Sequence, residues 1–170
     1  MTTKFLLMDA NVLIDYRDSD LEILALVSRH VGPVQVLSTI LAEEVPGVGE
    51  GDCARLGLRV IEPELEQVLR AGASRGRLSF GDHLCLIVAA DDGYACVTND
   101  RALRSACDAE QVETIWGLEL MTKLVELGIL SAGEVLAVAG KIHEANPLHI
   151  TADLIARFKR KVTDVESRRR

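Results

Sequence analysis

Short apolar runs alternate with longer amphipathic stretches along most of this chain. The strand-like runs cover residues 4–8, 34–38, 58–63, 94–100 and 112–116, and the helix-like segments between them cover residues 21–31, 39–45, 64–73, 80–92 and 101–110. A Gly-rich turn follows Pro46. Strands that alternate with helices are typical of a parallel sheet covered on both faces. We therefore predict an α/β fold with a central parallel sheet of four to five strands.

Three further helical patterns follow the last strand, at residues 118–127, 132–144 and 152–162. They predict a helical extension over about residues 118–162, added to a core at about residues 4–120. The whole is expected to form one domain over residues 1–165, with the charged residues 166–170 as a disordered tail. No apolar run approaches the roughly 20 residues that a membrane span needs. The short N-terminal apolar run lacks a cleavage site, so we expect a cytoplasmic protein.

Net charge and cysteine usage narrow the classes of function. The formal net charge is −7, whereas proteins that merely coat nucleic acid are usually basic. A nuclease stays compatible with this charge, because metal-binding carboxylates themselves make a chain acidic. The four cysteines form no CxxC pair, and no histidine lies at zinc-ligand spacing from one of them. Buried, reduced thiols are therefore expected.

Acidic residues end the predicted strands or flank them closely. Asp9 and Asp100 each end a strand, Asp82 lies in the first turn of the apolar helix at 80–92, and Glu43 and Glu44 follow the second strand. In a parallel α/β sheet, ligands bind beyond the carboxyl ends of the strands. Carboxylates gathered there repel one another, and their pKa values rise unless a cation neutralises them. Oxygen-only ligands suit Mg²⁺, with Mn²⁺ as a substitute.

Each of these acidic residues also has a purely structural interpretation. Asp9 and Asp100 could cap the helices that follow them. Asp82 stands three residues after Ser79, as in a variant of the capping box. The two glutamates could belong to a solvated helix face. The metal-site hypothesis therefore depends on the joint placement of these residues.

Three segments of the chain together resemble the PIN-domain nucleases. The run LLMDANVLIDY is similar to their opening motif, LSTILAEEV to their second motif, and SFGDHLCLIVAADDGYACVTNDRAL to their third. The order, spacing and element types match over about residues 4–120. Within this superfamily the chain is most similar to VapC-type toxin ribonucleases. The resemblance implies a PIN-like fold with extra C-terminal helices.

The resemblance also implies a role for each matched residue. The catalytic metal ligands would be Asp9, Glu44, Asp82 and Asp100. Supporting hydrogen bonds would come from Asn11, Thr98 and Ser38. Glu44 directly precedes Val45 and so suits the second motif better, whereas Glu43 remains the alternative ligand.

The implied reaction is hydrolysis of an RNA phosphodiester bond by a metal-activated water. An acidic site repels RNA, so nearby cations would have to contact the phosphates. The candidates are Arg75 and Arg77 before the helix at 80–92, and Arg101 and Arg104 after Asp100. The same arginines could equally be solvated helix residues.

Two other classes of function, and two kinds of partner, remain open. A haloacid-dehalogenase-type phosphohydrolase also begins with an Asp after a hydrophobic strand, and it would use Asp9 as a covalent nucleophile. It would, however, need a second Asp where this chain has Asn11. A catalytically inactive PIN-like interaction module would use the acidic residues only as caps. If the chain is a toxin, a small antitoxin protein would cover the site, and the Leu- and Val-rich helices could support a homodimer.

Overall fold

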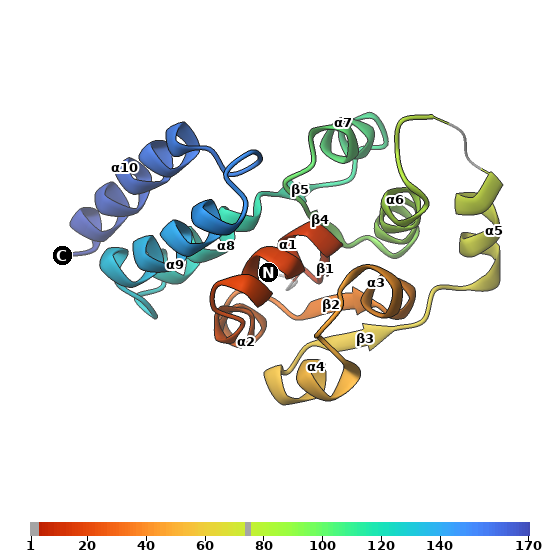
Figure 1. Cartoon of the computed structure of the whole chain (residues 1–170), viewed down its shortest axis with the longest axis horizontal. Helices are drawn as coiled ribbons and strands as arrows, with labels where there is room; N and C mark the ends of the chain where they lie inside the picture. The colour runs from red at the N-terminus through yellow and green to blue at the C-terminus, as the bar shows by residue number, and fades with distance from the viewer. Residues whose placement is uncertain (1–3, 74–75) are drawn as a thin grey trace.

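A computed structural model describes residues 4–73 and 76–170, and within them it contains a five-stranded parallel sheet (Figure 1). The strands are β1 (Leu6–Met8), β2 (Val34–Leu37), β3 (Arg59–Ile61), β4 (Ala95–Val97) and β5 (Thr114–Ile115). Their spatial order is β3-β2-β1-β4-β5, and every neighbouring pair is parallel. The predicted α/β fold class is confirmed.

Helices cover the two faces of the sheet because the order in which strands are added across the sheet changes direction after β3. It steps from β1 through β2 to β3, and then crosses back to β4 and β5. Right-handed crossovers place the helices of the two directions on opposite faces. One layer holds α1 (Ala10–Asp18), α2 (Glu22–His30), α3 (Ser38–Glu44) and α4 (Glu50–Leu56), and the other holds α5 (Leu65–Ala73), α6 (Phe80–Asp92) and α7 (Arg101–Ala109).

The sequence pattern did not predict helix α4, because its ends are rich in glycine. Gly49 precedes the helix, and its backbone N–H donates to the Asp52 carboxylate at 2.9 Å. Gly57 ends the helix in the left-handed conformation, with φ of 74°. Gly49, which was expected to lie in a turn, thus precedes a short helix, and Gly57 ends that helix.

Strand β1 lies at the centre of the sheet and is buried on both faces. Leu6, Leu7 and Met8 are each at most 3% exposed. Continuous burial is expected for a strand with helices above and below it. The strand therefore delivers the next residue, Asp9, to the middle of the sheet's carboxyl end.

The three C-terminal helices pack against α1 and α2 and against one another, and Figure 1 shows them together beside the sheet. They are α8 (Gly117–Glu126), α9 (Ala132–Ala145) and α10 (Ala152–Arg169). Within the described residues, none of the helices is long and apolar enough to cross a membrane.

Helix α10 continues through Arg169, so residues 166–169, which we expected to be disordered, form its last turn. Two contacts hold this turn in place. The Glu166 carboxylate accepts the Ala132 N–H at 3.0 Å at the start of α9. The Arg169 guanidinium lies directly against Gly128, where a side chain would collide with it.

Gly32 is expected to be essential for joining α2 to β2. A Cβ at this position would lie 2.7 Å from the backbone carbonyl oxygen of Lys4, which cannot move without shifting β1. The Gly32→Ala variant should therefore lose about 1–3 kcal/mol of unfolding free energy in urea titrations. Gly140 in α9 is the matched control, since a Cβ there meets no atom within 4 Å. Gly140→Ala should be neutral or more stable, and equal losses in both variants would contradict a steric role for Gly32.

Candidate active site

Asp9 is a buried carboxylate that no cap explains. It directly follows β1, occupies the N-cap position of α1, and makes no side-chain capping hydrogen bond. Instead, the Thr98 hydroxyl at the end of β4 donates to Asp9 Oδ2 at 2.9 Å. The Asp9 residue is 2% exposed, and burial raises the pKa of its carboxyl to about 7.

Asp9, Glu44 and Asp82 form a carboxylate cluster contributed by three separate elements. The negative charges of Asp82 and Glu44 both raise the pKa of Asp9, although the Thr98 hydroxyl and the Ala10 N–H lower it. The Glu44 residue is exposed, but partial desolvation of its carboxylate raises the pKa of this group too, and the charges of Asp82 and Glu43 add to that effect. Asp82 thus acts on the pKa of both Asp9 and Glu44, and Glu44 acts on that of Asp9, which places the three side chains in the same region at the carboxyl end of the sheet.

Gly81 lets the end of α3 approach the start of α6. A Cβ on Gly81 would lie 2.7 Å from Glu44 Oε2 and 2.8 Å from Glu44 Oε1. The Glu44 carboxylate therefore lies directly against the first turn of α6, beside Asp82. Glu43 is exposed and lines the same narrow cleft, together with Thr39, Ile40, Phe80 and Gly81. The contact with Gly81 favours Glu44 as the member of the cluster.

Asp82 and Asp100 both serve as helix caps in this structure. The Asp82 Oδ2 accepts the Ser79 N–H at 3.3 Å, and the Ser79 hydroxyl accepts the Asp82 N–H at 3.1 Å, which completes a capping box. The Asp100 Oδ1 accepts the Leu103 N–H at 2.8 Å. Each cap uses one carboxylate oxygen, so each residue keeps a second oxygen for another partner.

Asp100 is linked to Asp9 through Thr98. The Asp100 backbone N–H donates to Thr98 Oγ1 at 3.1 Å, and that same hydroxyl donates to Asp9. Thr98 therefore couples the ends of β1 and β4. Asn11 is exposed, and among the described residues neither Asn11 nor Ser38 makes a side-chain hydrogen bond to these carboxylates.

The proposed phosphate-binding arginines differ in their surroundings. Arg77 is exposed on the loop before α6, and Arg101 is exposed at the start of α7. Arg104 is half-buried, donates to the Thr98 carbonyl oxygen at 3.4 Å and lies 3.8 Å from the centre of the Trp116 ring. Arg75 lies outside the described residues. Arg104 is therefore the cation with a direct link to a residue that contacts Asp9.

The donor chemistry of the cluster suits a hard divalent cation, because every donor is a carboxylate oxygen. Burial is the main cause of the raised pKa values of Asp9 and Glu44, and repulsion between carboxylates adds to it; a cation would offset both effects. The Thr39 hydroxyl in the adjoining cleft is buried without a hydrogen-bond partner, and such a group is expected to bind water or a ligand. In the described part of the chain, however, no three His, Cys, Asp or Glu side chains lie close enough to hold one ion together.

A buried polar network that we did not predict holds the C-terminal helices beside the site. Asp15 of α1 accepts hydrogen bonds from Asn99 at 3.2 Å and from Asn146 at 3.1 Å. Asn99 also accepts the Gly117 N–H at 2.9 Å, and Tyr16 donates to the Gly117 carbonyl at 2.6 Å. The available signal was a charged residue on the apolar face of α1, between Val12 and Tyr16, which are both buried.

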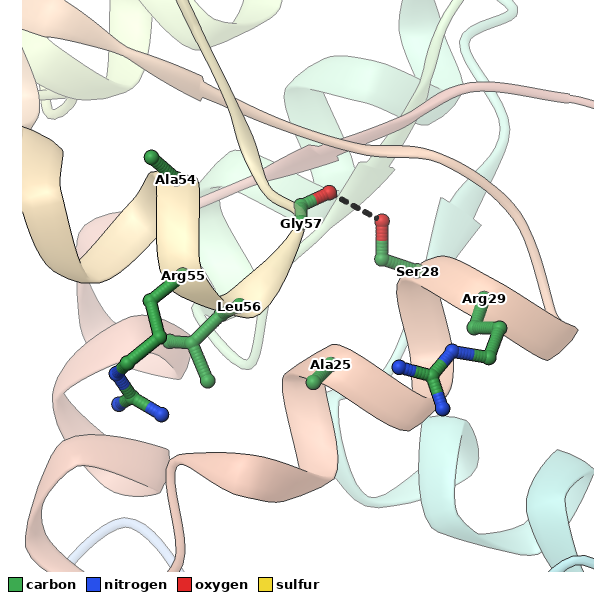
Figure 2. Close-up of a pocket in the computed structure, with 7 residues that line it drawn as sticks. All are labelled: Ala25, Ser28, Arg29, Ala54, Arg55, Leu56 and Gly57. Atoms are coloured by element: carbon green, nitrogen blue, oxygen red, sulfur yellow. Dashed lines mark hydrogen bonds between the residues drawn. The ribbon is translucent and has the colours of Figure 1, made fainter.

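A separate pocket of about 240 Å³ lies at the opposite end of the sheet, between α2 and α4. Figure 2 shows Arg29 and Arg55 at its sides and the hydrogen bond from the Ser28 hydroxyl to the Gly57 carbonyl, which is 2.8 Å long. Both helices end here, just before β2 and β3 begin. Cations at helix C-termini balance the carbonyl groups exposed there, which accounts for the two arginines.

Comparisons with known proteins assign no family to this chain. No protein-family model matches it. No curated protein matches its sequence significantly.

Proposed function

We propose that this protein is a metal-dependent endoribonuclease that hydrolyses RNA phosphodiester bonds at the Asp9–Glu44–Asp82 cluster. The observation that carries the proposal is the burial of Asp9 beside two further carboxylates at the carboxyl end of a parallel sheet. A carboxylate buried beside others of the same charge costs stability and is typical of a functional site. Asp82 and Asp100 contribute to their helix ends, but Asp9 does not cap α1.

The residues of the cluster would hold Mg²⁺ or Mn²⁺. In the described part of the chain these side chains do not yet lie close enough to share one ion, so binding would require them to move together. The second oxygen of Asp100 would join the set after the same kind of movement. When bound, the cation lowers the pKa of a coordinated water and polarises a phosphate oxygen. The chain's own residues orient the site. The Thr98 hydroxyl binds one oxygen of Asp9, and the Ser79 N–H binds one oxygen of Asp82. Gly81 has no side chain, which leaves room for the Glu44 carboxylate.

The decisive experiment measures cleavage of a labelled single-stranded RNA by the full chain. We expect cleavage with Mg²⁺ or Mn²⁺ and none with a chelator. The Asp9→Asn variant should lose more than about 100-fold of this activity, since even residues behind the direct ligands typically contribute about 10- to 100-fold. Asp92→Asn is the matched control, because Asp92 is exposed at the far end of α6.

Two outcomes would overturn the proposal. Undiminished cleavage by a folded Asp9→Asn protein would show that Asp9 takes no part in the cleavage reaction. A phosphate group covalently trapped on Asp9 after incubation with a small phosphate ester would instead favour a phosphohydrolase.

The biological role that we propose is the toxin of a toxin–antitoxin pair, following the resemblance of the three motifs. A small antitoxin, or a second copy of this chain, would then contact the surface around the cluster. Leu65 and Leu69 on α5 offer an exposed apolar face for such a contact. A short reading frame next to the gene, encoding a DNA-binding protein whose co-expression blocks RNA cleavage, would support this role.

A further inference from the structure

The chain's exposed aromatic rings are unevenly distributed over the surface. It contains one Trp, two Tyr and three Phe. Tyr16 and Phe158 are buried, and Phe5, which is 41% exposed at the other end of the sheet, packs edge-to-face on Tyr94 at 5.8 Å. Phe80 is 42% exposed and Trp116 is 40% exposed. Exposing large rings forgoes the stabilisation that their burial would bring. Within the described residues, Phe5 packs on another aromatic ring, whereas Phe80 and Trp116 do not.

Both of these rings lie at the carboxyl end of the sheet. Phe80 lies beside the helix that follows β2, Trp116 directly follows β5, and these two strands lie on opposite sides of β1. Phe80 begins α6, directly before Gly81, and lines the cleft that Glu43 and Glu44 also line. Strand β5 pairs with β4, on the other side of β1. The cluster therefore has an exposed aromatic ring on each flank.

Arg104 connects the Trp116 flank to Asp9. Its guanidinium carbon lies 3.8 Å from the centre of the Trp116 ring, so the cation covers one face of the indole. The same side chain donates to the carbonyl oxygen of Thr98, whose hydroxyl holds Asp9. This flank thus combines a flat ring with a positive charge, the two features that bind a base and its phosphate.

We propose that Phe80 and the Arg104–Trp116 pair are base-stacking platforms that hold unpaired nucleotides on either side of the carboxylate cluster. The proposal rests on the proposed ribonuclease function and adds how the substrate is positioned. Unpaired bases can stack on protein rings, whereas bases within a duplex already stack on their neighbours. The site should therefore bind a single strand through its bases as well as through its phosphates.

The sole tryptophan of the chain provides a direct test, because stacking of a base on Trp116 quenches its fluorescence. The wild-type chain is titrated with a short oligoadenylate in a chelating buffer, which prevents metal-dependent cleavage. We expect saturable quenching by the oligoadenylate. An abasic oligomer of the same length and charge, or an RNA duplex, should quench little and bind more weakly.

Substitution of the two rings separates stacking from charge attraction, with binding followed by anisotropy of a labelled oligoadenylate. Phe80→Leu and Trp116→Leu should each weaken binding by roughly 5- to 100-fold, the range that corresponds to one lost base stack. Phe5→Leu is the matched control, since it also removes a partly exposed phenyl ring but at the opposite end of the sheet. Its affinity should equal that of the wild type.

Equal binding of the abasic oligomer, or equal affinities for folded Phe80→Leu, Trp116→Leu and Phe5→Leu, would overturn the stacking proposal. Loss of binding to a protein partner alone in Phe80→Leu, with RNA binding intact, would assign that ring to a protein contact and would also overturn it. Cleavage is measured separately with Mn²⁺. Quenching without cleavage would contradict only the ribonuclease function, and cleavage without quenching would contradict only the stacking.

Discussion

Without added metal and at about pH 8, the Asp9→Asn protein should be about 2–4 kcal/mol more stable than the wild type. Burial raises the pKa of Asp9 from 3.8 to about 7, so keeping this carboxyl ionised in the folded chain costs free energy. Asparagine occupies nearly the same volume without a charge. Its side-chain oxygen can still accept the hydrogen bond from the Thr98 hydroxyl.

The pH dependence of this difference follows from the direction of the pKa shift. The folded chain holds the Asp9 proton more tightly than the unfolded chain does. The contribution of Asp9 to wild-type stability is therefore greatest below about pH 4, falls as the pH rises through about 7, and is constant above that. The increase in unfolding free energy caused by Asp9→Asn should accordingly be small near about pH 4 and largest near about pH 8.

Urea unfolding of both proteins over this pH range measures the difference between their unfolding free energies. Other titrating groups are the same in both proteins, so their contributions cancel in this difference. Saturating Mn²⁺ should reduce the difference in unfolding free energy, because a cation bound to Asp9 stabilises the folded wild type. A variant that is less stable than the wild type near about pH 8 would show that Asp9 serves the fold, as the inactive-module interpretation requires. That result would contradict the functional assignment of Asp9.

Gly81→Ala should reduce RNA cleavage by roughly 10- to 100-fold while leaving the fold intact, since a displacement of about 1 Å at a catalytic group can cost that much. The new methyl group would meet the Glu44 carboxylate at 2.7 Å, and this carboxylate is the mobile end of an exposed side chain. The Glu44 carboxylate would therefore have to move away from Gly81, which would change its position relative to Asp82. Alanine also favours the helical backbone over glycine, so stability should be unchanged or slightly higher.

Two neighbouring glutamates provide the matched controls for Gly81→Ala, with cleavage rate and urea unfolding as the measurements. Glu44→Gln should lose activity to a similar or greater extent, and Glu43→Gln should stay close to the wild type. Full activity in Gly81→Ala together with loss in Glu43→Gln would assign the ligand role to Glu43 instead. Full activity in all three variants would show that the end of α3 does not contribute to cleavage.

The hydrophobic pattern alone predicted the parallel sheet, its strand positions and most of the helices. This was possible because buried parallel strands and amphipathic helices impose distinct spacings on apolar residues over short stretches. Strand ends are equally local, so the amino-acid sequence by itself placed Asp9 and Asp100 at the carboxyl end of the sheet. The same pattern missed α4, whose glycines mark helix ends rather than a turn.

Only the tertiary structure decided which acidic residues come together and what each one does. Asp82 and Asp100 act as caps through hydrogen bonds to nearby backbone N–H groups. Asp9 does not cap the helix that follows it; its carboxylate instead accepts a hydrogen bond from Thr98, which lies 89 positions away in the sequence. Gly81 favours Glu44 over Glu43 because α3 and α6 approach each other there. Burial, mutual repulsion and hydrogen bonds between distant residues depend on packing in three dimensions, and no local spacing in the sequence encodes them.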